Sequence, residues 1–131
     1  MDQSVLVKGG KALVRALDQA DYAPRFVMWV HNEEINTWKL WLVPPKSEHI
    51  LDPLEFYRKL VSVMKSCRNK LYGVQAEQVE MVKDDCIAIH GLSKEMRISN
   101  LSDVYINRNM FNGYYLPEGI LLRNNIEIID I

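Results

Sequence analysis

The sequence has little of several features that mark particular classes of protein. Its only cysteines are Cys67 and Cys86, so the disulfide framework of a small secreted domain is not indicated. No apolar run approaches the roughly 20 residues needed to cross a bilayer, and the first 19 residues lack the basic start and apolar core of a signal peptide. We therefore expect a cytoplasmic protein without a membrane partner.

Glycine and proline are also scarce, with six and five residues. This composition is typical of an ordinary globular protein rather than a disordered or low-complexity chain. A chain of 131 residues has the usual size of one domain, and it is long enough to bury a stable core without disulfide bonds or metal ions. The sequence therefore predicts a single domain over residues 1–131.

Charge of one sign is not in excess, because 16 basic and 17 acidic residues give a net charge of −1. Binding to a phosphate backbone depends on many lysines and arginines, so nucleic acid is not expected as the primary partner. The charges are nevertheless uneven: residues 1–70 carry 11 basic and 8 acidic side chains, and residues 71–131 carry 5 and 9. Either chance or pairing with a charged partner, including a second copy arranged head to tail, explains this distribution.

Signatures of catalysis and metal binding are absent from the sequence. The stretch Gly9-Gly10-Lys11 lacks the earlier glycine and the following Ser or Thr of a phosphate-binding loop. Cys86 and His90 lie in "CIAIHG", which we expect to be a strand, and a rise of about 3.3 Å per residue would separate them by roughly 13 Å. The two cysteines and three histidines are scattered rather than spaced as metal ligands. We expect no catalytic residue, no metal, no cofactor, and a binding protein rather than an enzyme.

Two helices and several strands are indicated by the pattern of apolar residues. Residues 4–20 repeat apolar residues every three or four positions, and the glycine pair within them suggests close packing. A second helix is expected to begin with Asp52 as its N-cap, Pro53 in its first turn and Glu55 completing a capping box. Its buried stripe is expected to contain Leu54, Tyr57, Leu60 or Val61, Met64, and Cys67 or Leu71. Beyond residue 75 the chain becomes rich in strand-forming residues, with turns at Asn112-Gly113 and Pro117-Glu118-Gly119. The order α-β-β-α-β-β-β predicts an α+β two-layer sandwich, with two main helices on an antiparallel sheet.

An antiparallel hairpin over residues 25–43 is the feature of greatest functional interest. If its strands pair so that Phe26, Met28 and Val30 share a face with Trp38, Leu40 and Leu42, that face is apolar and takes the helices. The opposite face would then carry both Trp29 and Trp41, an exposed apolar area of a kind that monomers avoid. The C-terminal third of the chain, another protein chain or a small ligand would cover it. The other side chains of this expected face include Arg25, His31 and Lys39.

A second group of candidate binding residues lies in the segment "NRNMFNGYYLPEGILLRN". Its asparagines, arginines and aromatic residues either form turns and core or bind a small polar ligand. The candidates that we select from it are Arg108, Tyr114 and Tyr115. Together with the hairpin, these residues suggest a small protein-interaction module that acts as a subunit or accessory factor of a larger assembly. A protein partner or self-association is expected; the alternative function is binding of a small ligand or nucleotide.

Overall fold

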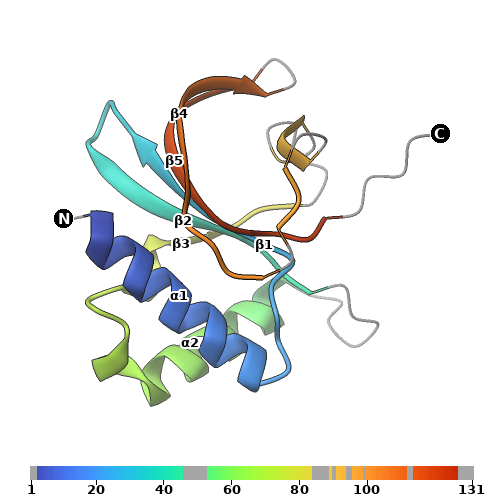
Figure 1. Cartoon of the computed structure of the whole chain (residues 1–131). Coiled ribbons are helices and arrows are strands. Elements are labelled where there is room, and N and C mark those ends of the chain that lie inside the picture. Colours follow the sequence, from blue (N-terminus) through green and yellow to red (C-terminus); the bar gives the residue numbers. More distant parts are fainter. Residues whose placement is uncertain are drawn as a thin grey trace.

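The computed structural model describes residues 3–45, 53–83, 89, 91–93, 96–98, 100–111 and 114–126, and for residues 53, 108–111 and 114–117 it describes the backbone alone. The chain folds into the expected α+β class, with two long helices below a curved sheet (Figure 1). The helices are α1 (Gln3–Gln19) and α2 (Pro53–Ser66), followed by the short 3-10 helices η1 (Arg68–Lys70) and η2 (Ala76–Gln78). The strands are β1 (Phe26–Asn32), β2 (Thr37–Val43), β3 (Val79–Met81), β4 (Val104–Phe111) and β5 (Tyr114–Asn124).

The five strands form one mixed sheet in the order β3-β2-β1-β5-β4. Three pairs are antiparallel, but β3 pairs with β2 in parallel, which corrects the expectation of a purely antiparallel sheet. A parallel pair needs a crossover connection of about a dozen residues or more. The long connection through α2, η1 and η2 provides this crossover, so the second helix determines the direction of β3.

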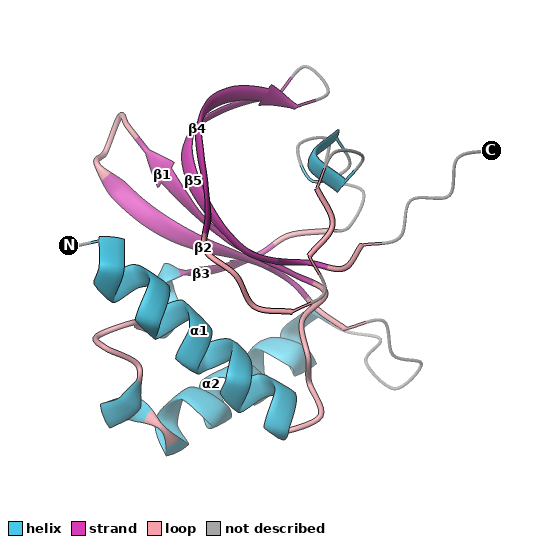
Figure 2. Cartoon of the chain, viewed as in Figure 1, coloured by secondary structure: helices cyan, strands magenta, loops and turns pink. Residues whose placement is uncertain are grey.

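Both faces of the sheet are buried, so later parts of the same chain cover the second face, which was one of the three possibilities that the sequence left open. On one face, α1 and α2 pack against alternate residues of the strands, including Val27, Trp29 and Leu40. On the other face, Phe26, Met28 and Leu121 pack against Ile89 and Leu92. Figure 2 shows the short helical segment that includes residues 89 and 91–93 on the side of the sheet that is opposite the two long helices. The helices therefore form one outer layer, and the chain between β3 and β4 contributes to a second.

The two adjacent glycines of α1 confirm the expected close packing. A Cβ atom at Gly9 would lie 2.5 Å from Val74 Cγ2 and 2.6 Å from the carbonyl oxygen of Leu71. A Cβ atom at Gly10 would lie 2.8 Å from Nε1 of Trp29. Because real Cβ contacts are longer than this, the absence of side chains allows α1 to approach both the sheet and the segment after α2.

The second helix begins at Pro53 as expected, and its buried stripe agrees with the expected one only in part. Phe56, Leu60 and Met64 are buried, whereas the side chain of Leu54 is exposed. Phe56 packs beside Tyr22, with ring centroids 6.2 Å apart. Asp52, the expected cap, lies outside the described residues.

The C-terminal third contains a long hairpin rather than several short strands. The sequence Pro117-Glu118-Gly119 lies inside β5, so the turn expected there is wrong. Proline is tolerated at this position because β5 pairs with β1 only from Gly119 onward, which leaves one edge of the earlier residues without a strand partner. In "CIAIHG", Ile89 and Gly91 are helical, contrary to the expected strand, while Cys86 and His90 lie outside the described residues.

An ion pair between α1 and β5 gives a first testable contribution to stability. Arg123 donates from Nη1 and Nη2 to the two carboxylate oxygens of Asp18, each at 2.9 Å. Arg123→Lys is expected to lower the free energy of unfolding by about 1–3 kcal/mol, because an ammonium group cannot reproduce the two parallel hydrogen bonds. Urea unfolding of Arg123→Lys, Asp18→Asn and the double variant measures this contribution. Additive losses would show that the pair contributes no coupling energy.

Candidate functional site

The register of the β1–β2 hairpin places Trp29 and Trp41 on opposite faces of the sheet. Trp29 is paired with Leu40, and Trp41 with Met28. Directly paired residues in an antiparallel ladder share a face, so the expected common face for the two tryptophans is wrong. The expected hairpin is confirmed, but its register differs from the expected one by one residue, which moves every side chain of one strand to the other face.

Trp29 is part of the helix-facing core. Its side chain is fully buried, and its indole Nε1 donates a hydrogen bond of 2.8 Å to the carbonyl oxygen of Leu6 in α1. A buried indole whose only polar group has a partner is typical of a core tryptophan. Trp29 is therefore inaccessible to a ligand or partner in this conformation.

The other candidates on the hairpin do not form one open surface either. Trp41 is half-buried and packs against the cluster of Phe26, Met28 and Leu121, on the face of the sheet away from the helices. Arg25 donates from Nε to the carbonyl oxygen of Pro44, and Lys39 donates from Nζ to that of Glu77. The remaining candidates lie in β4 and β5, where the side chains are outside the described part of the chain: Arg108, Tyr114 and Tyr115.

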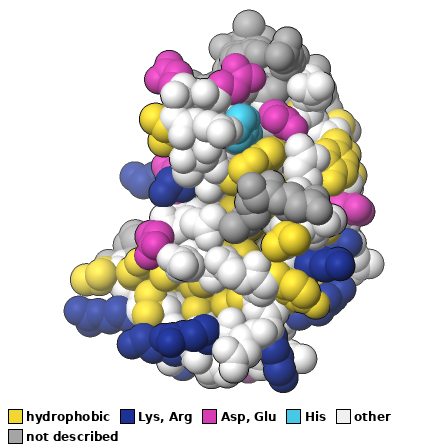
Figure 3. All heavy atoms as spheres, turned by 90° about the vertical axis from the view of Figure 1, so that its left-hand side faces the viewer, with side chains coloured by type: hydrophobic (Ala, Val, Ile, Leu, Met, Phe, Trp, Pro, Cys, Tyr) yellow, Lys and Arg dark blue, Asp and Glu magenta, His cyan; other side chains and the backbone are white. Residues whose placement is uncertain are grey.

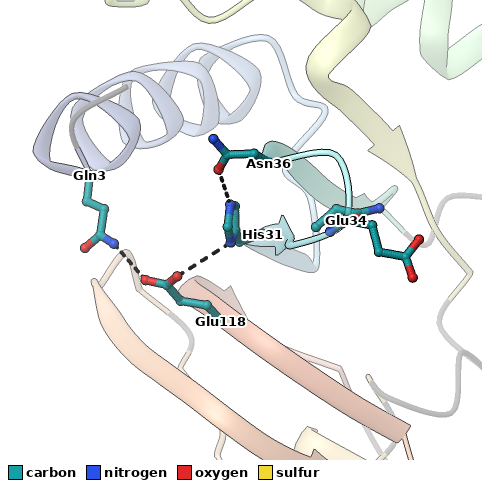
Figure 4. A network of polar contacts seen from close by, with 6 residues as sticks. Gln3, His31, Glu34, Asn36 and Glu118 are labelled. Carbon is teal, nitrogen blue, oxygen red and sulfur yellow. Dashed lines mark hydrogen bonds and ion pairs between the residues drawn. The ribbon is translucent and has the colours of Figure 1, made fainter.

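His31 joins the hairpin to β5 and to the start of α1 (Figure 4). Its Nε2 lies 3.0 Å from Oδ1 of Asn36, and its ring packs on Trp38 with centroids 4.8 Å apart. Its Nδ1 lies 3.7 Å from Oε2 of Glu118, which is too long for a hydrogen bond. Gln3 donates to the other oxygen of the same carboxylate at 2.8 Å. The histidine is thus held among structural contacts of three elements, with its ring covered by an indole.

Two grooves lie on either side of the segment that follows α2. The first, which we call the α2 groove, runs between the end of α2 and residues 71–77 and has a volume of about 460 Å³. Its floor is apolar and includes Val61, Met64, Leu71 and Val74. Lys65, Arg68 and Glu77 also line this groove with exposed side chains, so its rim carries two positive charges and one negative charge.

The second groove, which we call the α1 groove, lies between α1 and residues 67–72 and has a volume of about 780 Å³. Lys8, Lys11 and Arg15 follow one side of it, at the spacing of a single helical face, and Lys70 stands on the other side. Tyr72, also on this second side, is 55% exposed and has a φ angle of +53°. A bulky residue in this left-handed region carries about 1–3 kcal/mol of strain, and such strain is often found at functional sites.

The helical layer concentrates positive charge despite the nearly neutral chain. Helices α1, α2 and η1 together carry eight basic and two acidic residues. In Figure 3 most Lys and Arg side chains lie in the lower part of the view, with hydrophobic side chains between them, and most acidic side chains lie above. A ligand at this end of the molecule therefore meets a positive surface, and the net charge of the whole chain does not describe it.

The sequence contains one signal for the α1 groove, which is a row of basic residues at helical spacing. The spacing of Lys8, Lys11 and Arg15 is visible in the sequence, but such a row is also the ordinary solvated face of a helix. Which side faces the segment after α2 depends on the crossing of the two helices, which the sequence does not specify. The left-handed conformation of Tyr72 has no local sequence signal, because glycine or asparagine is the usual residue there.

Several classes of site are not found in the part of the chain that the structure describes. Within it, no three His, Cys, Asp or Glu side chains come together as metal ligands. Nor do the described residues include a helix long and apolar enough to cross a membrane. Comparisons with protein-family models, with curated proteins and with solved structures gave no match.

Proposed function

We propose that the protein is a cytoplasmic protein-interaction module that acts as a subunit or accessory factor of a larger assembly. It receives an acidic and apolar segment of a partner protein in the α2 groove. The observation that carries this proposal is an apolar floor, formed by Val61, Met64 and Leu71, beside a rim where Lys65 and Arg68 outweigh the single acidic residue, Glu77.

The apolar floor supplies most of the binding energy in this proposal. Burying one aliphatic side chain of a partner contributes about 1.5–3 kcal/mol, and the apolar floor of the groove offers a place for such a side chain. Val61 is half-buried, so it offers apolar surface to a partner without being essential to the core. Met64 beside it adapts its flexible side chain to differently shaped partners.

The cationic rim determines which segments bind. Exposed ion pairs contribute only about 0.2–1 kcal/mol each, so Lys65 and Arg68 select an acidic partner more than they hold it. The surrounding helical layer adds to this selection, because its eight basic residues repel a basic segment. The excess of basic residues in the first half of the sequence thus lies mainly in the helical layer beside the two grooves.

A short labelled peptide tests the proposal directly. The sequence IEIIDI combines acidic and apolar residues and also occurs at residues 126–131 of this chain. We expect saturable binding of fluorescein-labelled IEIIDI by fluorescence anisotropy, and binding at least about tenfold weaker for IKIIKI, because the rim repels lysine. Equal binding of the two peptides would contradict the proposal.

Charge reversal at matched positions of α2 provides the control. Lys65→Glu is expected to weaken binding of IEIIDI by about fivefold or more, since it replaces an attraction by a repulsion at the rim. Arg58→Glu makes the same change in net charge on the same helix, but Arg58 does not line the groove, so its effect should stay within about twofold. Sedimentation of the whole chain as a dimer, and of Lys65→Glu as a monomer, would identify the partner as a second copy.

A further inference from the structure

The α1 groove has a different chemistry from the α2 groove and suggests a different ligand. We infer that it binds single-stranded nucleic acid, with phosphates on Lys8, Lys11, Arg15 and Lys70 and a base stacked on Tyr72. This inference goes beyond the proposed protein interaction and does not depend on it. It combines the two parts of a non-specific single-strand site, which are a positively charged groove and an aromatic platform.

The cations of this groove are available to a ligand. Lys8, Arg15 and Lys70 are exposed, and within the described part of the chain none of them forms an ion pair. Lys11 lies 3.9 Å from the exposed carboxylate of Asp103, a contact that solvent weakens. Lys8 and Arg15 are seven residues apart, which corresponds to about 10 Å along the helix axis. The cations therefore follow the groove as a row rather than forming a single point of charge.

Tyr72 makes nucleic acid a better candidate than another polyanion. Tyr72 is 55% exposed and lines the same groove as Lys70, so a base is able to stack on its ring while the phosphate reaches the lysine. The left-handed backbone at Tyr72 holds the ring in this position although a glycine would be free of strain there. A lipid headgroup has no flat aromatic face to place on this ring, whereas every nucleotide of a single strand carries one.

The shape of the groove favours a single strand over a duplex or a bilayer. A duplex keeps its bases within the stack, where Tyr72 cannot reach them. A bilayer is recruited by a surface with projecting apolar side chains, whereas the apolar residues between α1 and residues 67–72 line a recess. The low net charge of the whole chain argued against a nucleic-acid partner, but that charge is an average over a basic helical layer and an acidic remainder.

The salt dependence of binding to fluorescein-labelled oligo(dT) and oligo(U) tests the electrostatic part. Each phosphate contact on a single strand contributes about −0.7 to the slope of log K against log salt concentration, so four contacts predict a slope of about −3. Lys8→Gln combined with Arg15→Gln should reduce this slope to about −1.4. Arg58→Gln, which removes an exposed arginine on α2 outside both grooves, should leave the slope unchanged.

Variants at Tyr72 test the stacking part separately. Tyr72→Ala should weaken binding by about 5- to 100-fold with the slope unchanged, whereas Tyr72→Phe should bind as the unaltered protein does. Circular dichroism of both variants is the control that checks whether the fold is retained. Val61→Ser removes part of the α2 groove floor, so it should weaken peptide binding but leave oligonucleotide binding unchanged. The two proposals can therefore fail independently of each other.

Three results would overturn this inference. The first is the absence of saturable binding to either oligonucleotide at about 50 mM salt, where electrostatic attraction is strong. The second is equal binding to duplex DNA and heparin with no effect of Tyr72→Ala, which would indicate a general polyanion surface. The third is binding to phosphatidylserine vesicles, dependent on Lys8 and Arg15, without binding to the oligonucleotides.

Discussion

Trp29→Ala is expected to lower the free energy of unfolding by about 3–5 kcal/mol, the largest loss for any single truncation that we anticipate. The side chain is fully buried between the sheet and α1, where it packs against Gly10. Removing it leaves a cavity that the neighbouring helix cannot fill, and it removes the hydrogen bond from the indole to Leu6. Urea unfolding followed by circular dichroism measures the loss without relying on tryptophan fluorescence.

Trp41→Ala is the matched control for this prediction. Trp41 is half-buried on the opposite face of the same hairpin, so truncating it should be clearly less destabilising than truncating Trp29. Trp29→Phe should also lose less, because the ring still fills most of the space and the Leu6 carbonyl keeps its helical hydrogen bond. A loss below about 1 kcal/mol for Trp29→Ala, accompanied by altered self-association, would instead make Trp29 a contact residue.

The wrong prediction about this tryptophan has a specific physical origin. The positions from Phe26 to Val30 are all buried in the structure, so the strand does not alternate between apolar and polar residues. Without alternation, the pattern of β1 fits either register equally well. The choice is made by the hairpin loop, where Asn36 has a φ angle of +48°, and by packing against α1. Neither can be derived from the apolar pattern of the two strands.

Features with strong local signals were predicted more successfully. The start of α2 at Pro53 and the span of the hairpin depend on capping and turn residues close in sequence. The parallel strand β3 and the long strand β5 depend on pairings across the fold, and their description from sequence was incomplete. The two grooves also depend on such distant packing, because one lies between α1 and the segment that follows α2, and the other between that segment and α2 itself.

Gly9→Ala should destabilise the protein by about 1–3 kcal/mol, although alanine is the better helix former by about 1 kcal/mol. The added methyl group would meet the Leu71 carbonyl oxygen at 2.6 Å and the Val74 side chain at 2.5 Å. A backbone carbonyl cannot move aside as a flexible side chain does, so the segment that follows α2 has to shift away from α1. Chemical unfolding of the variant measures the net effect, and a gain of stability would show that the close approach does not exist.

A second substitution separates the two contacts made at Gly9. Val74→Ala shortens the side chain that meets the new methyl group, but it leaves the Leu71 carbonyl in place. The free energy of unfolding of the Gly9→Ala/Val74→Ala variant should therefore fall by less than the sum of the two single losses. The difference should be smaller than the Gly9→Ala loss itself, because the contact with the Leu71 carbonyl remains. Because Leu71 lines both grooves, Gly9→Ala should also weaken binding of the acidic peptide and of the oligonucleotide while every cation remains in the chain. Unchanged affinities would mean that the segment keeps its position and that the strain is absorbed within α1.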